Sequence, residues 1–293
     1  MNEKLMSKMY PIKLAVPALL VYTIFIIVPF IISAVMSFTD WNITRLYEVE
    51  FRGFDNYISI FQDEIFIRSI CNTLLFAIST TILKTLFGLG LALALLKVSK
   101  INNVLRTIYY VPCVLSPLII GVIFTSILAN EGLLNNLLQF LGLSAIAKPW
   151  LGEYVTAMSS VILIEGWMWS GFNMFIFIAG LQAISIDYYE YADTEGISKF
   201  QQFRYITLPL LMPSFTVIIM LNITGSLKVF DLIYVLTKGG PGFDTQVMST
   251  FVYNAFGLGL LGESSAGSVI LAIIVVGMSF GLNKFMRSKE VEM

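Results

Sequence analysis

The sequence predicts an all-α integral membrane protein with six transmembrane helices, and its composition and its long apolar segments are the observations that predict it. Of the 293 residues, 57% are hydrophobic and only 13% are charged, and the mean hydropathy is +0.82. Soluble domains carry roughly 25% charged residues, so this chain cannot hide its apolar surface in a water-soluble fold. A helix that crosses a bilayer needs about 20 mostly apolar residues. Six such segments are found, at residues 14–39, 70–96, 107–128, 155–184, 209–230 and 264–285.

The first segment, residues 14–39, is too long for the core of a signal peptide, and no small-residue cleavage site follows it. The second and fourth segments are interrupted by Lys84 and Glu165, which fall at similar depth near the helix centres. Charges at membrane depth are costly and usually face a partner or a cavity. We favour a structural ion pair inside the bundle, with a place on a transport pathway as the alternative. Lys228 and Asp231, near the outer end of the fifth segment, are expected to pair locally or reach the interface.

The distribution of lysine and arginine predicts the orientation. Eleven of these residues flank one set of segment ends and five flank the other, and cytoplasmic loops carry the excess. Both termini and the loops after the second and fourth segments are therefore predicted to be cytoplasmic. The eleven are Lys4, Lys8, Lys13, Lys97, Lys100, Arg106, Lys199, Arg204, Lys284, Arg287 and Lys289.

The outer loops contain further expected elements. Residues 56–66 and 133–141 are expected to form short helices that lie along the membrane surface. Gly239-Gly240-Pro241-Gly242 is a turn-forming cluster. These loops are long enough to contact another protein, although plain connection is the simpler alternative.

Several classes of function are excluded or disfavoured. A net charge of −1 argues against a nucleic-acid binder, and a chain without histidine has no histidine metal site or general base. Cys71 and Cys113 lie in apolar segments, so we expect buried small side chains and not a disulfide or a metal site. There is no Gly-Lys-Ser or Gly-Lys-Thr phosphate loop, no Gly-x-Ser-x-Gly elbow and no catalytic carboxylate pair within the segments. We therefore expect no enzymatic activity, no metal and no ATP hydrolysis by this chain.

The charged segment at residues 190–213 separates the fourth and fifth apolar segments. Its pattern predicts two short amphipathic helices hinged at Gly196, followed by a membrane helix that opens with Pro209. Proline is tolerated in a first helical turn, where its missing N–H would have no partner in any case. From physics alone, an ordinary cytosolic loop with a solvated helix is the alternative.

This segment resembles the "EAA" loop of binding-protein-dependent ABC transporter permeases. Glu190-Tyr191-Ala192 is followed by Gly196 six residues after the glutamate and then by Thr207-Leu208-Pro209. Tyr191 replaces the family's usual small residue, and Glu195 stands where aspartate usually precedes the glycine. The resemblance extends along nearly the whole chain to the carbohydrate-uptake branch, through residues 55–57 (Asp-Asn-Tyr), 72–74 (Asn-Thr-Leu), 180–184 (Gly-Leu-Gln-Ala-Ile) and 236–241 (Leu-Thr-Lys-Gly-Gly-Pro).

The resemblance implies a type I ABC importer permease fold and a defined set of partners. These are a second permease subunit, two copies of a cytosolic ATPase that binds the ATP, and an extracytoplasmic solute-binding protein that delivers a carbohydrate. Residues 67–287 would form the permease core, with the first helix and outer loop at 1–66, a tail at 288–293 and a coupling loop at 187–207. The resemblance places contact with the ATPase at Glu190, Ala192, Gly196, Phe200 and Pro209.

Two helix stripes are candidates for the substrate site. Aromatic faces stack on the C–H face of a sugar, and a few placed polar groups bond to its hydroxyls. Ordinary helix packing with interhelical hydrogen bonds is the alternative for both stripes. A neutral sugar is favoured, because only Lys84 and Lys228 are available to a phosphate ester, but the sugar itself stays open. The stripes are Glu165, Trp169, Phe172 and Asn173 on the fourth helix, and Phe215, Asn222, Ser226 and Val229 on the fifth.

A secondary transporter is the rival hypothesis, with Lys84, Glu165 and Asp231 relaying protons or coupling ions. The sequence shows neither the internal repeat nor the paired broken helices that such transporters often have.

Overall fold

The computed structural model describes residues 15–45 and 49–288, in which all regular secondary structure is helical apart from one isolated bridge between Thr39 and Phe51. The predicted all-α class is confirmed over this part of the chain. Lys4, Lys8, Lys13 and Lys289, which contribute to the predicted orientation, lie outside the described residues, as does the tail from residue 289. The chain divides into two compact units, residues 1–63 with 252–270, and residues 64–251 with 271–293.

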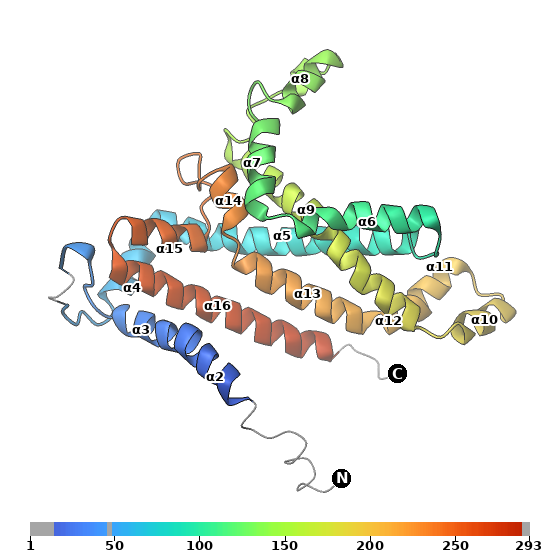
Figure 1. The fold of residues 1–293 in the computed structure, drawn as a ribbon, viewed down its shortest axis with the longest axis horizontal. Coiled ribbons are helices and arrows are strands. Elements are labelled where there is room, and N and C mark those ends of the chain that lie inside the picture. The colour runs from blue at the N-terminus through green and yellow to red at the C-terminus, as the bar shows by residue number, and fades with distance from the viewer. Residues whose placement is uncertain (1–14, 46–48, 289–293) are drawn as a thin grey trace, which may run out of the picture. The chain divides into compact units, whose positions relative to one another are not determined.

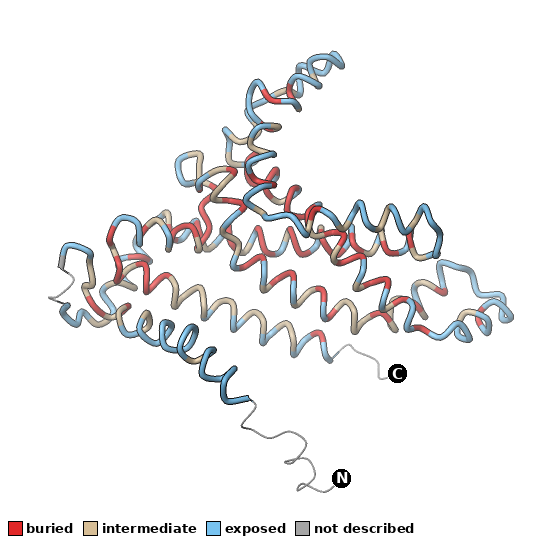
Figure 2. The backbone as a smooth tube through the Cα atoms, viewed as in Figure 1, coloured by how far each residue is buried: buried red, intermediate tan, exposed pale blue. Residues whose placement is uncertain are grey.

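The first unit contains the first apolar helix. It runs through α2 (Val16–Tyr22), a π-helical turn η2 (Thr23–Ile27) and α3 (Val28–Met36), and none of its residues is buried (Figure 2). It is followed by η3 (Ile43–Arg45) and α4 (Asp55–Gln62). The predicted helix at residues 56–66 is broken at Asp63, whose backbone is extended.

A half-buried amide joins the pieces of this first unit. Asn56 Nδ2 donates to the carbonyl oxygens of Ser37 at 2.8 Å and Thr39 at 2.7 Å, and the Tyr57 hydroxyl lies 2.7 Å from Ser37 Oγ. The Asp-Asn-Tyr motif therefore fixes the turn that follows the first helix.

The second unit is built on two long helices, α5 (Glu64–Ala94) and α9 (Tyr154–Ala183), which pack against each other (Figure 1). Gly88 permits the close approach, because a Cβ there would lie only 2.5 Å from the Cβ of Asn173. Gly90, from the same stripe of small residues, meets nothing within 4 Å. The close contact of small residues is thus confined to one side of α5.

Further helices belong to the second unit in whole or, for α15 and α16, in part. Helix α13 packs against α5, α6 against α9, and α14 against α7 (Figure 1). Helix α16 begins in the first unit, and its later residues 274–282 pack on α13. The bounds are α6 (Lys100–Val114), α7 (Pro117–Ile127), α8 (Leu133–Phe140), η4 (Ser144–Ile146), α13 (Met212–Leu227), α14 (Asp231–Leu236), α15 (Met248–Gly257) and α16 (Leu261–Arg287).

The third predicted segment is not one straight helix. Helices α6 and α7 meet at 96°. Ser116 precedes Pro117 and has an extended backbone with ψ of 134°, as the residue before a proline prefers. A second bend, of 63°, lies between residues 199–210 and α13. Four described helices are long and apolar enough to cross a membrane, and the number rises to six if each bent pair counts as one crossing.

One smaller expectation is wrong, and one alternative of another is not observed. Cys71 is exposed and Cys113 only half-buried, because both lie on helix faces that do not point into the unit. Lys228 and Asp231 were expected to pair locally or to reach the interface; they form no ion pair within the described residues, and both are exposed. The chain breaks between them at Phe230, so Asp231 lies in the first turn of a new helix, where its charge suits the helix dipole.

Polar side chains of α5 hold the loop that contains Gly239-Gly240-Pro241-Gly242. Asn72 Nδ2 donates to the carbonyl oxygens of Asp244 at 2.6 Å and Gln246 at 2.9 Å, and Tyr154 donates to Asn72 Oδ1 at 3.0 Å. Thr73 Oγ1 accepts the backbone N–H of Met248 at 2.9 Å. The Asn-Thr-Leu motif therefore anchors residues 244–248 to α5.

Candidate functional site

A buried polar network joins three helices of the second unit. Lys84 Nζ on α5 donates to Glu165 Oε1 on α9 at 2.7 Å and to Ser226 Oγ on α13 at 3.1 Å. Thr80 Oγ1 donates to the same Ser226 oxygen at 2.9 Å. The Lys84 and Glu165 side chains are 4% and 9% exposed. The predicted ion pair is present, and it compensates two charges that would otherwise be costly at this depth.

A cavity of about 290 Å³ lies beside this network. The Trp169 and Phe172 rings meet edge to face, with centroids 6.0 Å apart and planes at 88°. Lys84 Nζ lies 5.9 Å from the centre of the Trp169 ring, within cation–π range. The cavity therefore has aromatic walls and a charge-compensated polar side. It is lined by Lys84, Glu165, Trp169, Phe172, Leu221, Asn222 and Gly225.

Asn222 contributes to this cavity an amide group whose hydrogen bonds are incomplete. The residue is 7% exposed, and its side-chain nitrogen is buried without a partner among the described residues. A buried donor without a partner is costly and calls for an explanation such as a ligand or a water. The amide nitrogen of Asn222 is therefore an open hydrogen-bond donor at the cavity.

The other predicted substrate residues are placed differently. Asn173 is fully buried where α9 contacts Gly88, it does not line the cavity, and neither atom of its amide group has a partner among the described residues. Ser226 reaches the site only through Lys84. Phe215 packs on Phe177, with ring centroids 4.8 Å apart, and Val229 packs on an apolar cluster. The stripes thus combine cavity-lining residues with packing residues.

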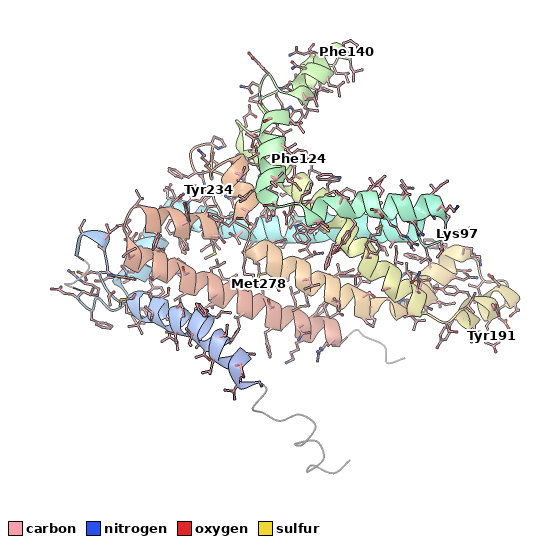
Figure 3. All side chains as sticks on the ribbon, in the orientation of Figure 1. Lys97, Phe124, Phe140, Tyr191, Tyr234 and Met278 are labelled. Carbon is pink, nitrogen blue, oxygen red and sulfur yellow. The ribbon has the colours of Figure 1, made fainter. Side chains whose placement is uncertain are left out.

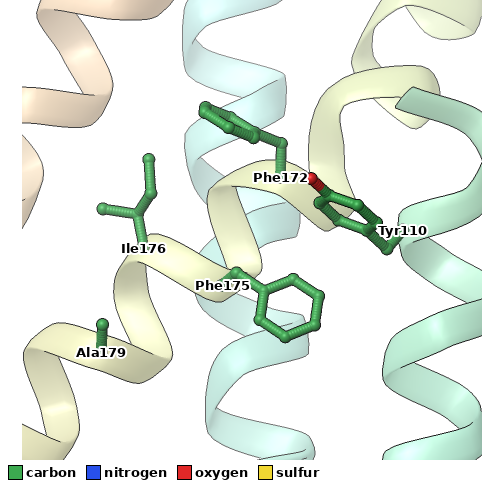
Figure 4. Close-up of a pocket in the computed structure, with 5 residues that line it drawn as sticks. All are labelled: Tyr110, Phe172, Phe175, Ile176 and Ala179. Atoms are coloured by element: carbon green, nitrogen blue, oxygen red, sulfur yellow. The ribbon is translucent and has the colours of Figure 1, made fainter. Parts of the chain in front are cut away.

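A second hollow lies on another face of α9 and shares Phe172 with the cavity. It measures about 480 Å³ and is almost wholly apolar. Figure 4 shows its lining residues, Tyr110, Phe172, Phe175, Ile176 and Ala179. Gly171 makes this contact of α6 with α9 possible, since a Cβ there would overlap the carbonyl oxygen of Tyr109.

The residue pattern did not indicate Tyr110, Phe175, Ile176 and Ala179 around the hollow, or Leu221 and Gly225 around the cavity. The Tyr109-Tyr110 pair within an apolar segment was the available signal for the first of these. Nothing in their surroundings marks Leu221 or Gly225.

The charged segment after α9 forms two short helices, as predicted. Helix α10 (Asp187–Thr194) and α11 (Lys199–Gln202) are separated by Gly196, whose φ of +71° is in the left-handed region. A π-helical turn η5 (Phe203–Thr207) and α12 (Leu208–Leu210) follow, and Pro209 lies in the first turn of α12. The long apolar helix does not open with Pro209 as expected, because α13 begins at Met212 after the 63° bend. Glycine adopts this backbone without the steric cost that a Cβ would add, so the residue fits the turn.

Exposed aromatic side chains mark the outer face of this coupling loop, which we define as residues 187–207. Tyr191 is 73% exposed and Phe200 77% exposed (Figure 3 labels Tyr191). Glu190 and Gly196 are also exposed, whereas Ala192 is buried beneath them. Hydrogen bonds from Lys199, and to a smaller extent from Gln202, lower the pKa of Asp193 from its ordinary value of 3.8. The loop therefore presents an apolar, aromatic surface with an ionised carboxylate beside it.

Most of the chain is similar to known transport proteins. Residues 84–287 match the family described as "Binding-protein-dependent transport system inner membrane component". YurN of Bacillus subtilis, a probable ABC transporter permease protein, is 34% identical over 290 residues, covering 98% of this chain and 99% of YurN. MalF of Thermococcus litoralis, a trehalose/maltose transport system permease protein, is 35% identical over 265 residues, covering 90% of this chain and 88% of MalF.

A solved structure has the same fold. One chain of a bacterial alginate ABC transporter, crystallised in complex with an alginate pentasaccharide-bound periplasmic protein, superposes with a TM-score of 0.81. The two chains are 25% identical, and the match covers 94% of this chain and 93% of that chain.

Proposed function

We propose, from the premise that this chain belongs to the binding-protein-dependent transport system inner membrane components, that it is the permease subunit of an ABC importer for a sugar. The observation that carries the proposal is the similarity to MalF, which spans 90% of this chain. A cavity with two aromatic walls and an open amide donor supports the same conclusion, because sugars are held by ring stacking and a few directed hydrogen bonds. A permease subunit moves its substrate without changing it chemically.

The proposal includes an assembly in the cytoplasmic membrane. The chain would pair with a second permease subunit, an ATPase dimer that binds the ATP on the cytosolic side, and a solute-binding protein on the outer side. Counting each bent helix pair as one crossing gives six crossings. An even number places both termini on one side, and the lysine and arginine excess makes that side cytoplasmic.

In the proposed site, Trp169 and Phe172 provide the aromatic surface and Asn222 Nδ2 donates a hydrogen bond to a sugar hydroxyl. Glu165 Oε1 is engaged by Lys84, and its second carboxylate oxygen has no partner among the described residues, so that oxygen is available to accept a hydroxyl. The opposite charges of Lys84 and Glu165 cancel. The cavity therefore favours a neutral sugar over an acidic sugar or a phosphate ester.

Transport would proceed by alternating access. Closure of the ATPase dimer on binding ATP would move the coupling loop, and α12 and α13 follow that loop directly in the chain. Because Asn222 and Ser226 lie on α13, movement of this helix would change the shape of the sugar site and its contact with Lys84. Sugar from the binding protein would enter the outward-open site, and ATP hydrolysis would return the inward-open state.

The assembly is tested by affinity purification of the tagged chain in mild detergent, with a variant that lacks residues 190–196. We expect wild type to retain an ATPase and a second hydrophobic subunit, and the deletion to lose the ATPase. A wild-type chain that purifies alone would argue against the importer.

The sugar site is tested by Asn222→Leu, compared with Thr224→Val on the same helix. Thr224 bonds to Ser279 and does not line the cavity. Replacing the unpartnered amide removes a buried donor, so stability should be unchanged or raised while uptake of maltose or trehalose falls. Thr224→Val should keep uptake at equal membrane abundance. Equal uptake by Asn222→Leu and wild type would remove Asn222 from the site.

A further inference from the structure

The two helices of the coupling loop are bridged by one carboxylate. We propose that Asp193 is a positioning residue that locks α10 and α11 into a single rigid unit across Gly196. The proposal rests on the proposed function in one respect, that the exposed face of this loop receives the ATPase. Gly196 then sets the angle between the helices and does not act as a flexible joint.

The bridge is made of three hydrogen bonds to Asp193, which lies in the last turn of α10. Lys199 Nζ, in the first residue of α11, donates to Oδ1 at 2.7 Å and to Oδ2 at 2.9 Å. Gln202 Nε2, at the end of α11, donates to Oδ1 at 2.5 Å. Both ends of α11 are therefore tied to one side chain of α10.

Gln202 makes this bridge more than an ion pair in solvent. Its side chain is buried at 3% exposure, and its Nε2 also donates to the carbonyl oxygen of Ile197 at 3.1 Å. Its Oε1 accepts a hydrogen bond from Lys199 Nζ at 3.2 Å. Exposed ion pairs are weak and are screened by salt, whereas a buried amide is held by its surroundings. Asp193 thus accepts from one adaptable donor and from one fixed donor.

A second hydrogen bond joins α10 to the chain that follows α11. The Tyr189 hydroxyl of α10 lies 2.9 Å from Thr207 Oγ1, and Thr207, the last residue of η5, is 5% exposed. At the turn itself, Ile197 N–H donates to the carbonyl oxygen of Ala192 at 2.9 Å. A change of angle at Gly196 would have to break several of these bonds together.

The consequence concerns how displacement is transmitted. A force applied to the exposed aromatic face of α10 would be absorbed by a free joint at Gly196. With α10 and α11 locked together, the same displacement reaches α12 and α13, because these follow α11 in the chain. Asp193 touches neither the cavity nor its lining residues, so its effect is on transmission.

The lock can be measured without any partner, by pulsed electron paramagnetic resonance on the purified full-length chain. Spin labels replace the exposed side chains of Tyr191 on α10 and Phe200 on α11, with Cys71 and Cys113 changed to serine. We expect one narrow distance distribution in this background and a broad one after Asp193→Ala. Asp193→Asn should restore part of the narrow component, since its amide oxygen still accepts from Gln202.

Glu195→Ala is the matched control, because it removes an exposed carboxylate of the same loop that forms no ion pair among the described residues. Its distance distribution should stay narrow. An Asp193→Ala distribution as narrow as that of the parent, or equal broadening by Glu195→Ala, would overturn the lock.

Transmission is measured on the complex purified with its ATPase. Asp193→Ala should retain the ATPase and its KM for ATP, but lose several-fold in the ATPase rate stimulated by the sugar-loaded binding protein, with partial recovery in Asp193→Asn. Loss of the ATPase itself from Asp193→Ala would make Asp193 a contact residue and overturn the positioning role. If the wild-type chain carries no ATPase, the proposed function fails, while the spin-label result still decides the lock.

Discussion

Replacing Lys84 by methionine while Glu165 stays in place would leave an uncompensated carboxylate inside the helix bundle. At the observed 2.7 Å, two unit charges attract by about 6 kcal/mol with an effective dielectric constant of about 20. Most of that attraction offsets the cost of removing both groups from water. Removing one partner of a buried pair therefore costs about 3–5 kcal/mol, whereas replacing both by apolar groups is close to neutral. We expect Lys84→Met and Glu165→Met each to lower stability strongly and the double variant to recover most of the loss.

The measurement is the stability of each detergent-purified variant, followed as the fraction that stays monodisperse with rising temperature. Lys228→Met is the control, because Lys228 is an exposed lysine on the same bundle and its loss should change stability by less than about 0.5 kcal/mol. A double variant no more stable than the single variants would refute the compensated pair. Uptake by a stable double variant then separates the two roles, since a purely structural pair leaves uptake intact and a pair on the pathway does not.

The remaining predictions concern backbone geometry, protonation and the outer loop. Gly196→Pro should abolish ATPase co-purification at normal membrane abundance, because proline cannot adopt a φ of +71° and lacks the N–H that bonds to Asp193; unchanged co-purification would contradict this. Because the pKa of Asp193 is lowered in the folded chain, its ionised form stabilises the lock at pH values above the unfolded pKa. The spin-label distance distribution should therefore stay narrow from neutral pH to about pH 4 and broaden as the pH falls through the lowered Asp193 pKa. Asp193→Asn should show no such dependence. Asn72→Ala should cost about 1–3 kcal/mol and speed proteolysis at residues 239–244, and an unaltered digestion rate would argue against the anchor.

Much of the architecture could be predicted from composition and local chemistry. The two-helix loop around Gly196 is encoded by a glycine between amphipathic segments, and the structure gives that glycine a positive φ. The pairing of Lys84 with Glu165 follows from the cost of isolated charges at equal depth in neighbouring helices. The first prediction depends on local chemistry alone, and the second needs only that the two helices are neighbours.

The direction of each helix and the face on which each side chain lies were harder to predict than the position of the helices along the chain. A hydropathy window over residues 107–128 sees length and apolarity, but the right angle between α6 and α7 comes from Ser116 and Pro117, which such a window ignores. Asn173 is eight residues beyond Glu165, which at 3.6 residues per turn is about 80° around the helix. That rotation is enough to move its amide from the cavity to the contact with α5.

The break between α6 and α7 limits what can lie beside this part of the chain. Leu115 and Ser116 are both exposed and have extended backbone, and the neighbouring Pro112 and Pro117 supply no N–H. Hydrocarbon offers no partner to peptide groups, so non-helical backbone at membrane depth persists only beside protein or water. If α6 and α7 form one crossing, this break needs protein or water beside it, which a straight helix would not. A chain without its partner subunits would leave this break facing lipid and would be less stable. The amount of the chain that persists in a cell would then depend on how completely its complex has assembled.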